Sequence, residues 1–215
     1  WKQEHYIFFS TRNGTVKKTA LSDFANVRRG GIIAIKIVPG DNLIEARFTS
    51  GHDDVVLVTA KGMSIRFHED GVRTMGRTAA GVRGIRLGND DHVVALAIVS
   101  DDATLLVAGE NGIGKRTVFD DYRVQSRGGK GIKTMKITNK TGNVVGGLTV
   151  HEGDEIMLIT VGGQMVRTTV DGIRQAGRNT QGVRLVNLDE SDRLQDIAPV
   201  ITAEKEEEAG EDDEE

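Results

Sequence analysis

The chain has 215 residues, of which 28 are lysine or arginine, 32 are aspartate or glutamate and none is cysteine, and its formal net charge is −4. The lack of cysteine excludes a disulfide framework and thiolate metal sites. No apolar run approaches the ~20 residues of a membrane span and none resembles a signal peptide, so we expect a soluble, intracellular protein.

The charge is unevenly distributed along the chain. Glu204–Glu215 holds nine acidic residues and one lysine, so the remaining residues carry 27 bases and 23 acids, a net charge of +4. A like-charged run without apolar residues cannot offset its ordering entropy. We therefore predict a folded body over residues 1–201 and a disordered acidic tail over 202–215, which either aids solubility or competes with nucleic acid for the basic body. Because Trp1 is not an initiator methionine, we expect the chain to be part of a longer protein.

The body contains four repeats of about fifty residues, at about 6–51, 54–102, 104–153 and 155–200. Each repeat opens with an apolar run and a glycine turn, which together predict a β-hairpin. A polar, glycine-rich loop follows. The expected third strands are Ile32–Ile37, Val82–Leu87, Ile132–Ile137 and Val183–Leu188. The expected fourth strands are Leu43–Phe48, Val93–Val99, Val144–Val150 and Leu194–Val200. This pattern predicts an all-β, propeller-like array of about four four-stranded blades.

Basic residues recur at the same places in the repeats. One series stands four residues after each turn glycine and comprises Lys18, Arg66, Arg116 and Arg167. Others mark the glycine-rich loops, whose glycines are expected to let backbone N–H groups approach a phosphate. Positive charge repeated on stacked units forms a stripe that suits a long polyanion, and the low aromatic content of 4% favours duplex DNA over single strands. The candidate DNA-binding residues are Lys17, Lys18, Arg28, Arg29, Lys36, Arg66, Arg77, Arg83, Arg86, Lys115, Arg116, Arg127, Lys130, Lys133, Lys136, Arg178 and Arg184.

Other functions receive less support from the residues. Gly109–Arg116 is close to a phosphate-binding GxxxxGK[ST] loop, but Arg116 replaces the hydroxyl residue that binds magnesium. The five histidines are scattered, so we expect no metal site, and no grouping of residues suggests catalysis. A basic residue on an edge strand can also serve only to block sheet-to-sheet aggregation. The remaining alternative function is a protein-interaction propeller in which the basic residues only balance solubility.

The loop Gln125-Ser126-Arg127-Gly128-Gly129-Lys130-Gly131 resembles the glycine–arginine box (QRRGGKG) of the DNA gyrase A C-terminal domain family, from which it differs only at Ser126. Five further segments resemble later blades of that domain: 13–19, 75–78, 81–88, 111–117 and 177–183. The box of the family lies in the first of about six blades, whereas this loop lies in the third repeat, so two blades are expected before Trp1. The related domain of topoisomerase IV is a rival.

The resemblance implies a β-pinwheel, a propeller whose blades exchange strands, with duplex DNA bent around its rim and little sequence specificity. It implies a non-catalytic part of a bacterial, cytoplasmic and nucleoid-associated enzyme that introduces negative supercoils. Its partners would be the gyrase B subunit together with the rest of the gyrase A subunit. No cofactor is expected in this chain, because ATP and magnesium would be used by other parts of the enzyme.

Overall fold

The computed structural model describes residues 5–201, and the predicted acidic tail lies outside them. In this range four hairpins are formed, each by two antiparallel strands. The hairpin strands are β1 (Tyr6–Thr11) and β2 (Thr15–Ala20), β4 (Asp54–Thr59) and β5 (Met63–His68), β8 (Thr104–Gly109) and β9 (Ile113–Val118), and β12 (Glu155–Thr160) and β13 (Met165–Thr169). A short 3-10 helix follows each hairpin: η1 (Leu21–Phe24), η2 (Glu69–Gly71), η3 (Phe119–Asp121) and η4 (Val170–Gly172). Within these residues no helix is long and apolar enough to cross a bilayer.

The predicted fourth strands are present, and each pairs with the first strand of the same repeat. These strands are β3 (Leu43–Thr49), β7 (Val93–Ile98), β11 (Val144–Val150) and β15 (Leu194–Pro199). All four pairings contain a register shift near the turn end of the hairpin, which bends the sheet there.

The predicted third strands differ from the expectation in length and in the sheet they join. They shrink to two residues, in β6 (Val82–Arg83), β10 (Ile132–Lys133) and β14 (Val183–Arg184), and 32–37 of the first repeat contains no strand. Each pairs with the hairpin of the preceding repeat: β6 with β2, β10 with β5 and β14 with β9. The described residues therefore form three four-stranded sheets and one three-stranded sheet. In each four-stranded sheet, one strand comes from the next repeat. This strand exchange confirms the β-pinwheel.

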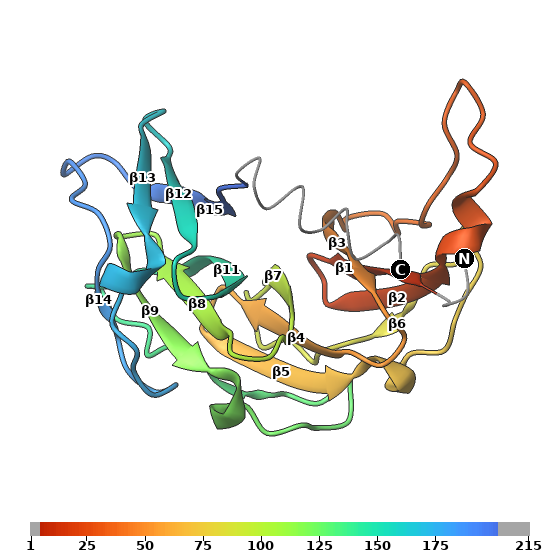
Figure 1. Ribbon diagram of the computed structural model, residues 1–215, viewed down its shortest axis with the longest axis horizontal. Coiled ribbons are helices and arrows are strands. Elements are labelled where there is room, and N and C mark those ends of the chain that lie inside the picture. Colours follow the sequence, from red (N-terminus) through yellow and green to blue (C-terminus); the bar gives the residue numbers. More distant parts are fainter. Residues whose placement is uncertain (1–4, 202–215) are drawn as a thin grey trace.

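The four sheets lie along an arc, with the first and the fourth at its two ends (Figure 1). Strands β3, β7, β11 and β15 pack on one another in that order along the inner side, so the exchanged strands lie on the outer edge. Apolar side chains fill the spaces between neighbouring sheets. Val55 and Leu57 of β4 face the first sheet, whereas Val56 and Val58 face the third. A strand covered on both faces reads as a continuous apolar run, which explains the sequence of β4.

Candidate nucleic-acid interface

The most regular basic series of the sequence forms ion pairs, and its first three members are largely shielded from solvent, whereas Arg167 is exposed. Lys18 lies 3.6 Å from Glu69, Arg66 lies 2.7 Å from Asp54, and only 6% and 16% of the two basic side chains are exposed. Arg116 pairs with Glu152 at 2.7 Å, and Arg167 pairs with Glu155. The expectation that Lys18, Arg66 and Arg116 face solvent as DNA contacts is therefore wrong. Their charges are neutralised within the protein, and the next repeat covers them.

The covering segment runs directly over this series. Thr74, Val124 and Gln175 form single parallel bridges to Lys18, Arg66 and Arg116 respectively. Arg66 Nη1 also donates to the carbonyl of Phe119 at 2.9 Å, and Arg116 Nε donates to that of Ile173 at 2.9 Å. These contacts hold one blade to the next.

Lys17 and Lys115 are fully buried as well, which corrects their placement on the outer surface. Lys17 Nζ donates to the carbonyls of Ala34 and Arg77, at 2.6 and 2.5 Å. Lys115 Nζ donates to the carbonyls of Gly177 and Arg178, both at 2.5 Å. Burial, with a nearby arginine, lowers the pKa of each lysine to about 8.

The other candidates gather where a loop of one repeat lies against the third segment of the repeat before it. Two sets of hydrogen bonds, one from the backbone and one from arginine side chains, repeat at this place. The N–H groups of Lys36, Arg86 and Lys136 donate to the carbonyls of Ala79, Gly129 and Thr180. The guanidinium groups of Arg77, Arg127 and Arg178 donate to the carbonyls of Ile33, Arg83 and Lys133, at 3.1, 3.0 and 2.8 Å. The structure thus brings basic residues from successive repeats together.

We call these places the first, second and third junctions. The first contains Lys36 and Arg77; the second contains Arg83, Arg86, Arg127 and Lys130; the third contains Lys133, Lys136 and Arg178. Arg77 and Arg178 are half-buried and the others are exposed. Within residues 5–201 none of the nine takes part in an ion pair. They are positive charges that no carboxylate neutralises.

The second junction has the highest charge and contains the box-like loop. Arg86 and Lys130 line a cavity of about 360 Å³ there. Its lining also includes Asp91, whose carboxylate accepts from Thr59 Oγ1 and from the N–H of Lys61. Four cations from two repeats with no carboxylate partner repel one another, and a bound polyanion relieves that repulsion. The charge pattern therefore fits a phosphate backbone.

The box-like loop is attached to the second repeat by its backbone. The N–H of Gln125 donates to the carbonyl of Arg66, and that of Gly128 to the carbonyl of Gly84, at 2.8 and 2.6 Å. Ser126 and Lys130 are exposed. The Gly128 N–H therefore already has a protein acceptor, contrary to the expectation that it approaches a phosphate.

The last loop glycine has a structural role instead. Gly131 has a φ of +75°, and a Cβ added there would lie 2.1 Å from the carbonyl oxygen of Ser64. Gly81 and Gly182 meet the preceding strand in the same way. Only glycine permits the close approach that lets the exchanged strand pair. The glycines that recur at the ends of these loops are thus explained by strand exchange.

The remaining candidates lie at the ends of the series. Arg28 and Arg29 are exposed in the first repeat, and Arg184 is exposed on β14, where it bonds the side chain of Asn187 at 3.1 Å. Sequence reasoning missed one further basic series. Arg73, Arg123 and Arg174 are exposed, and each stands directly before a residue that bridges to the preceding sheet. Their spacing of about fifty residues could have revealed them.

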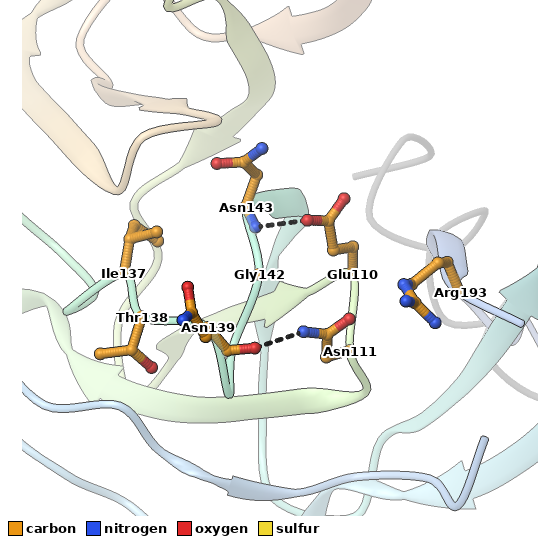
Figure 2. Close-up of a pocket in the computed structure, with 8 residues that line it drawn as sticks. All are labelled: Glu110, Asn111, Ile137, Thr138, Asn139, Gly142, Asn143 and Arg193. Atoms are coloured by element: carbon orange, nitrogen blue, oxygen red, sulfur yellow. Dashed lines mark hydrogen bonds between the residues drawn. The ribbon is translucent and has the colours of Figure 1, made fainter. Parts of the chain in front are cut away.

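A second cavity, of about 410 Å³, lies beside the hairpin turn of the third repeat (Figure 2). Glu110 accepts a hydrogen bond from the N–H of Asn143 at 3.0 Å, and Asn111 donates to the carbonyl of Asn139 at 2.9 Å. Arg193 is the one basic residue of its lining. This mixed lining does not favour a polyanion, so the junctions remain the candidate interface.

A family model described as "DNA gyrase C-terminal domain, beta-propeller" matches residues 5–50, 53–100, 103–151 and 154–201. The DNA gyrase A protein of Salmonella typhimurium is 48% identical over 188 residues, which are 87% of this chain and 21% of that protein. The DNA gyrase A protein of Mycolicibacterium smegmatis is 48% identical over 195 residues, which are 90% of this chain and 23% of that protein. The chain thus spans less than a quarter of the length of these curated relatives.

Two solved structures have the same fold. A DNA gyrase A C-terminal domain aligns with a TM-score of 0.84 and 28% identity, over 93% of this chain and 67% of that one. The C-terminal domain of DNA topoisomerase IV aligns with a TM-score of 0.88 and 26% identity, over 100% of this chain and 68% of that one. The fold alone does not separate the two, whereas the family model and the sequence relatives favour gyrase A.

Proposed function

The chain belongs to the DNA gyrase A C-terminal domain family, and from that membership we propose that its outer edge binds and bends duplex DNA. The observation that supports the proposal is the set of unneutralised cations, seven exposed and two half-buried, at three successive junctions. The contact residues would be the nine junction cations with Arg28, Arg29 and Arg184, and the newly found Arg73, Arg123 and Arg174.

The charge arrangement suits the DNA backbone better than the bases. The junctions follow one another along the arc, so a duplex that follows the outer edge passes each of them in turn (Figure 1). Arginine and lysine bind phosphate oxygens through charge-assisted hydrogen bonds, which position DNA without reading its sequence. We therefore expect binding with little sequence specificity.

Wrapping around a convex edge requires DNA to bend. Smooth bending of 20–30 bp by 40–90° costs on the order of 1–6 kcal/mol. Each neutralised phosphate releases counterions, and affinity then falls with salt with a slope of about −0.9 per contact. Contacts at several junctions can offset the bending cost, and the resulting affinity must depend steeply on salt.

In the parent enzyme the wrap would present a neighbouring DNA segment for strand passage with one handedness, which favours negative supercoiling. The partners there would be the gyrase B subunit together with the rest of the gyrase A subunit, in the bacterial cytoplasm around the nucleoid. ATP hydrolysis and DNA cleavage would belong to those other parts.

Ligation of nicked circular DNA in the presence of the protein tests the bend and its hand. A chiral wrap shifts the linking number of the closed product in proportion to the bound protein, whereas an unchanged linking number would contradict wrapping. A filter-binding titration against salt, on linear duplex, shows whether the protein still binds DNA. It therefore distinguishes an absence of wrapping from a loss of binding. A protein-interaction propeller would show no retention of duplex even at low salt.

A further inference from the structure

Two of the three junctions contain a feature that the DNA-binding proposal does not use. At the first and third junctions a buried lysine of the preceding blade reaches the carbonyl of the arginine that begins the next loop. Lys17 contacts the carbonyl of Arg77, and Lys115 contacts that of Arg178. At the second junction the same position of the blade is Ile65, which lies beneath Gly129.

Each ammonium group is bound by acceptors within the protein. The three N–H groups of Lys115 have three acceptors: the carbonyls of Gly177 and Arg178, and Thr180 Oγ1 at 3.0 Å. Lys17 has two carbonyl acceptors and lies 5.4 Å above the ring of Phe9. Both side chains are fully buried, so neither ammonium is open to an external phosphate.

The partner arginines are held at both ends. Arg178 gives its carbonyl to Lys115, and its guanidinium donates to the carbonyl of Lys133 at 2.8 Å. Arg77 is held in the same way, between Lys17 and the carbonyl of Ile33. A loop whose backbone and side chain are both fixed loses little conformational entropy when it meets DNA.

We propose that Lys17 and Lys115 are positioning residues for DNA binding, which preorganise the loops at 77–81 and 178–182 by binding their carbonyls and never contact the DNA. The inference rests on the proposed function, but its first consequence is visible without DNA. The second loop, 126–131, lacks this ammonium and is held by Arg127, whose Nε donates to the carbonyl of Gly71 at 2.6 Å.

Amide hydrogen exchange of the free protein, with Lys115→Met, tests the positioning role. We expect amide exchange at 178–182 to become at least about tenfold faster, because the loop loses the ammonium that donates to all three of its acceptors. The exchange rate at 126–131 should stay unchanged. Ile65→Met is the matched control, since it alters the same position without a charge. Unchanged exchange at 178–182 would overturn the proposal, whether or not the protein binds DNA.

The salt dependence of DNA affinity separates positioning from direct contact. Lys115→Met should weaken binding several-fold and leave the slope of log affinity against log salt unchanged. A slope reduced by about 0.9 would show a lost phosphate contact and contradict the proposal. If Lys115→Met does not fold, Lys115→Arg serves: it keeps a charge but cannot direct three donors from one nitrogen. Faster exchange at 178–182 in that variant supports positioning, and wild-type exchange with wild-type affinity refutes it.

Discussion

The guanidinium of Arg127 donates a hydrogen bond to the main-chain carbonyl of Arg83 at 3.0 Å, so two arginines from successive repeats meet at one junction. Neither has a carboxylate partner among the described residues. Such a pair persists because the carbonyl accepts from the guanidinium while both charges remain open to solvent. The outer edge is therefore positive where the repeats join.

Neutralising the second junction should weaken DNA binding through lost phosphate contacts. In Arg86→Ala/Lys130→Ala both exposed cations are removed without a loss of ion pairs, so we expect the salt slope to fall by about 1.8. Filter binding over a range of salt concentrations measures the slope. Arg193→Ala, beside the cavity of Figure 2, removes one positive charge away from the junctions and should change the slope little. Equal effects of both changes would argue against a specific role for the junction.

Removal of Glu69 should destabilise the fold. Its carboxylate is fully buried, accepts from Thr49 Oγ1 and the N–H of Gly51 at 2.9 Å, and faces Lys18. Glu69→Ala leaves a buried ammonium without its counter-charge, which costs about 3–5 kcal/mol. Urea unfolding measures the loss, and the exposed neighbour Asp70→Ala should cost under about 1 kcal/mol. A similar loss of unfolding free energy in both variants would show that the ion pair between Lys18 and Glu69 does not hold the two blades together.

The exchanged strand β10 should depend on a glycine. Gly131→Ala places a Cβ against Ser64 and forces a non-glycine residue to a positive φ, which alone costs about 1–3 kcal/mol. Gly30→Ala, where no atom lies within 4 Å, should be tolerated. Thermal unfolding compares the two variants. A stable Gly131→Ala protein would mean that β10 does not need its close approach to β5.

The two buried lysines should make stability rise with pH. Their pKa of about 8 lies below the ordinary 10.5, so above pH 8 the folded state holds fewer protons than the unfolded chain. The free energy of unfolding should then increase by up to about 1.4 kcal/mol per pH unit for each lysine, between about pH 8 and 9.5. Burial is the largest cause of both lowered pKa values. Arg77 and Arg178 lower them further, whereas Asp23 and Asp121 raise them.

Urea unfolding at several pH values checks this slope. The double variant Lys17→Met/Lys115→Met should lose most of it, and the same slope in that variant would contradict the assignment to these lysines. The increase with pH should end below pH 10. Burial raises the pKa of Tyr122, so above pH 10 this side chain makes the free energy of unfolding fall with pH.

The hairpins and inner strands were predictable because apolar runs and glycine turns act locally. Strand exchange was not predictable from the period, because a periodic sequence assigns Val82–Leu87 equally well to its own blade or to the preceding one. The same ambiguity affected the basic series. Lys18, Arg66 and Arg116 recur with the most regular spacing because each forms an ion pair under the segment that crosses from the next repeat. Their regular spacing therefore reflects the packing of the blades. The family resemblance, by contrast, supplied the exchange that spacing could not.

Lysine footprinting of the DNA complex tests most directly whether the junctions form the DNA-binding surface. Acetylation of free and bound protein, followed by mass spectrometry, compares the reactivity of exposed lysines. DNA should protect Lys36, Lys130, Lys133 and Lys136 and leave Lys140, in the turn before β11, reactive. Protection of Lys140 with no protection of the four junction lysines would contradict the account.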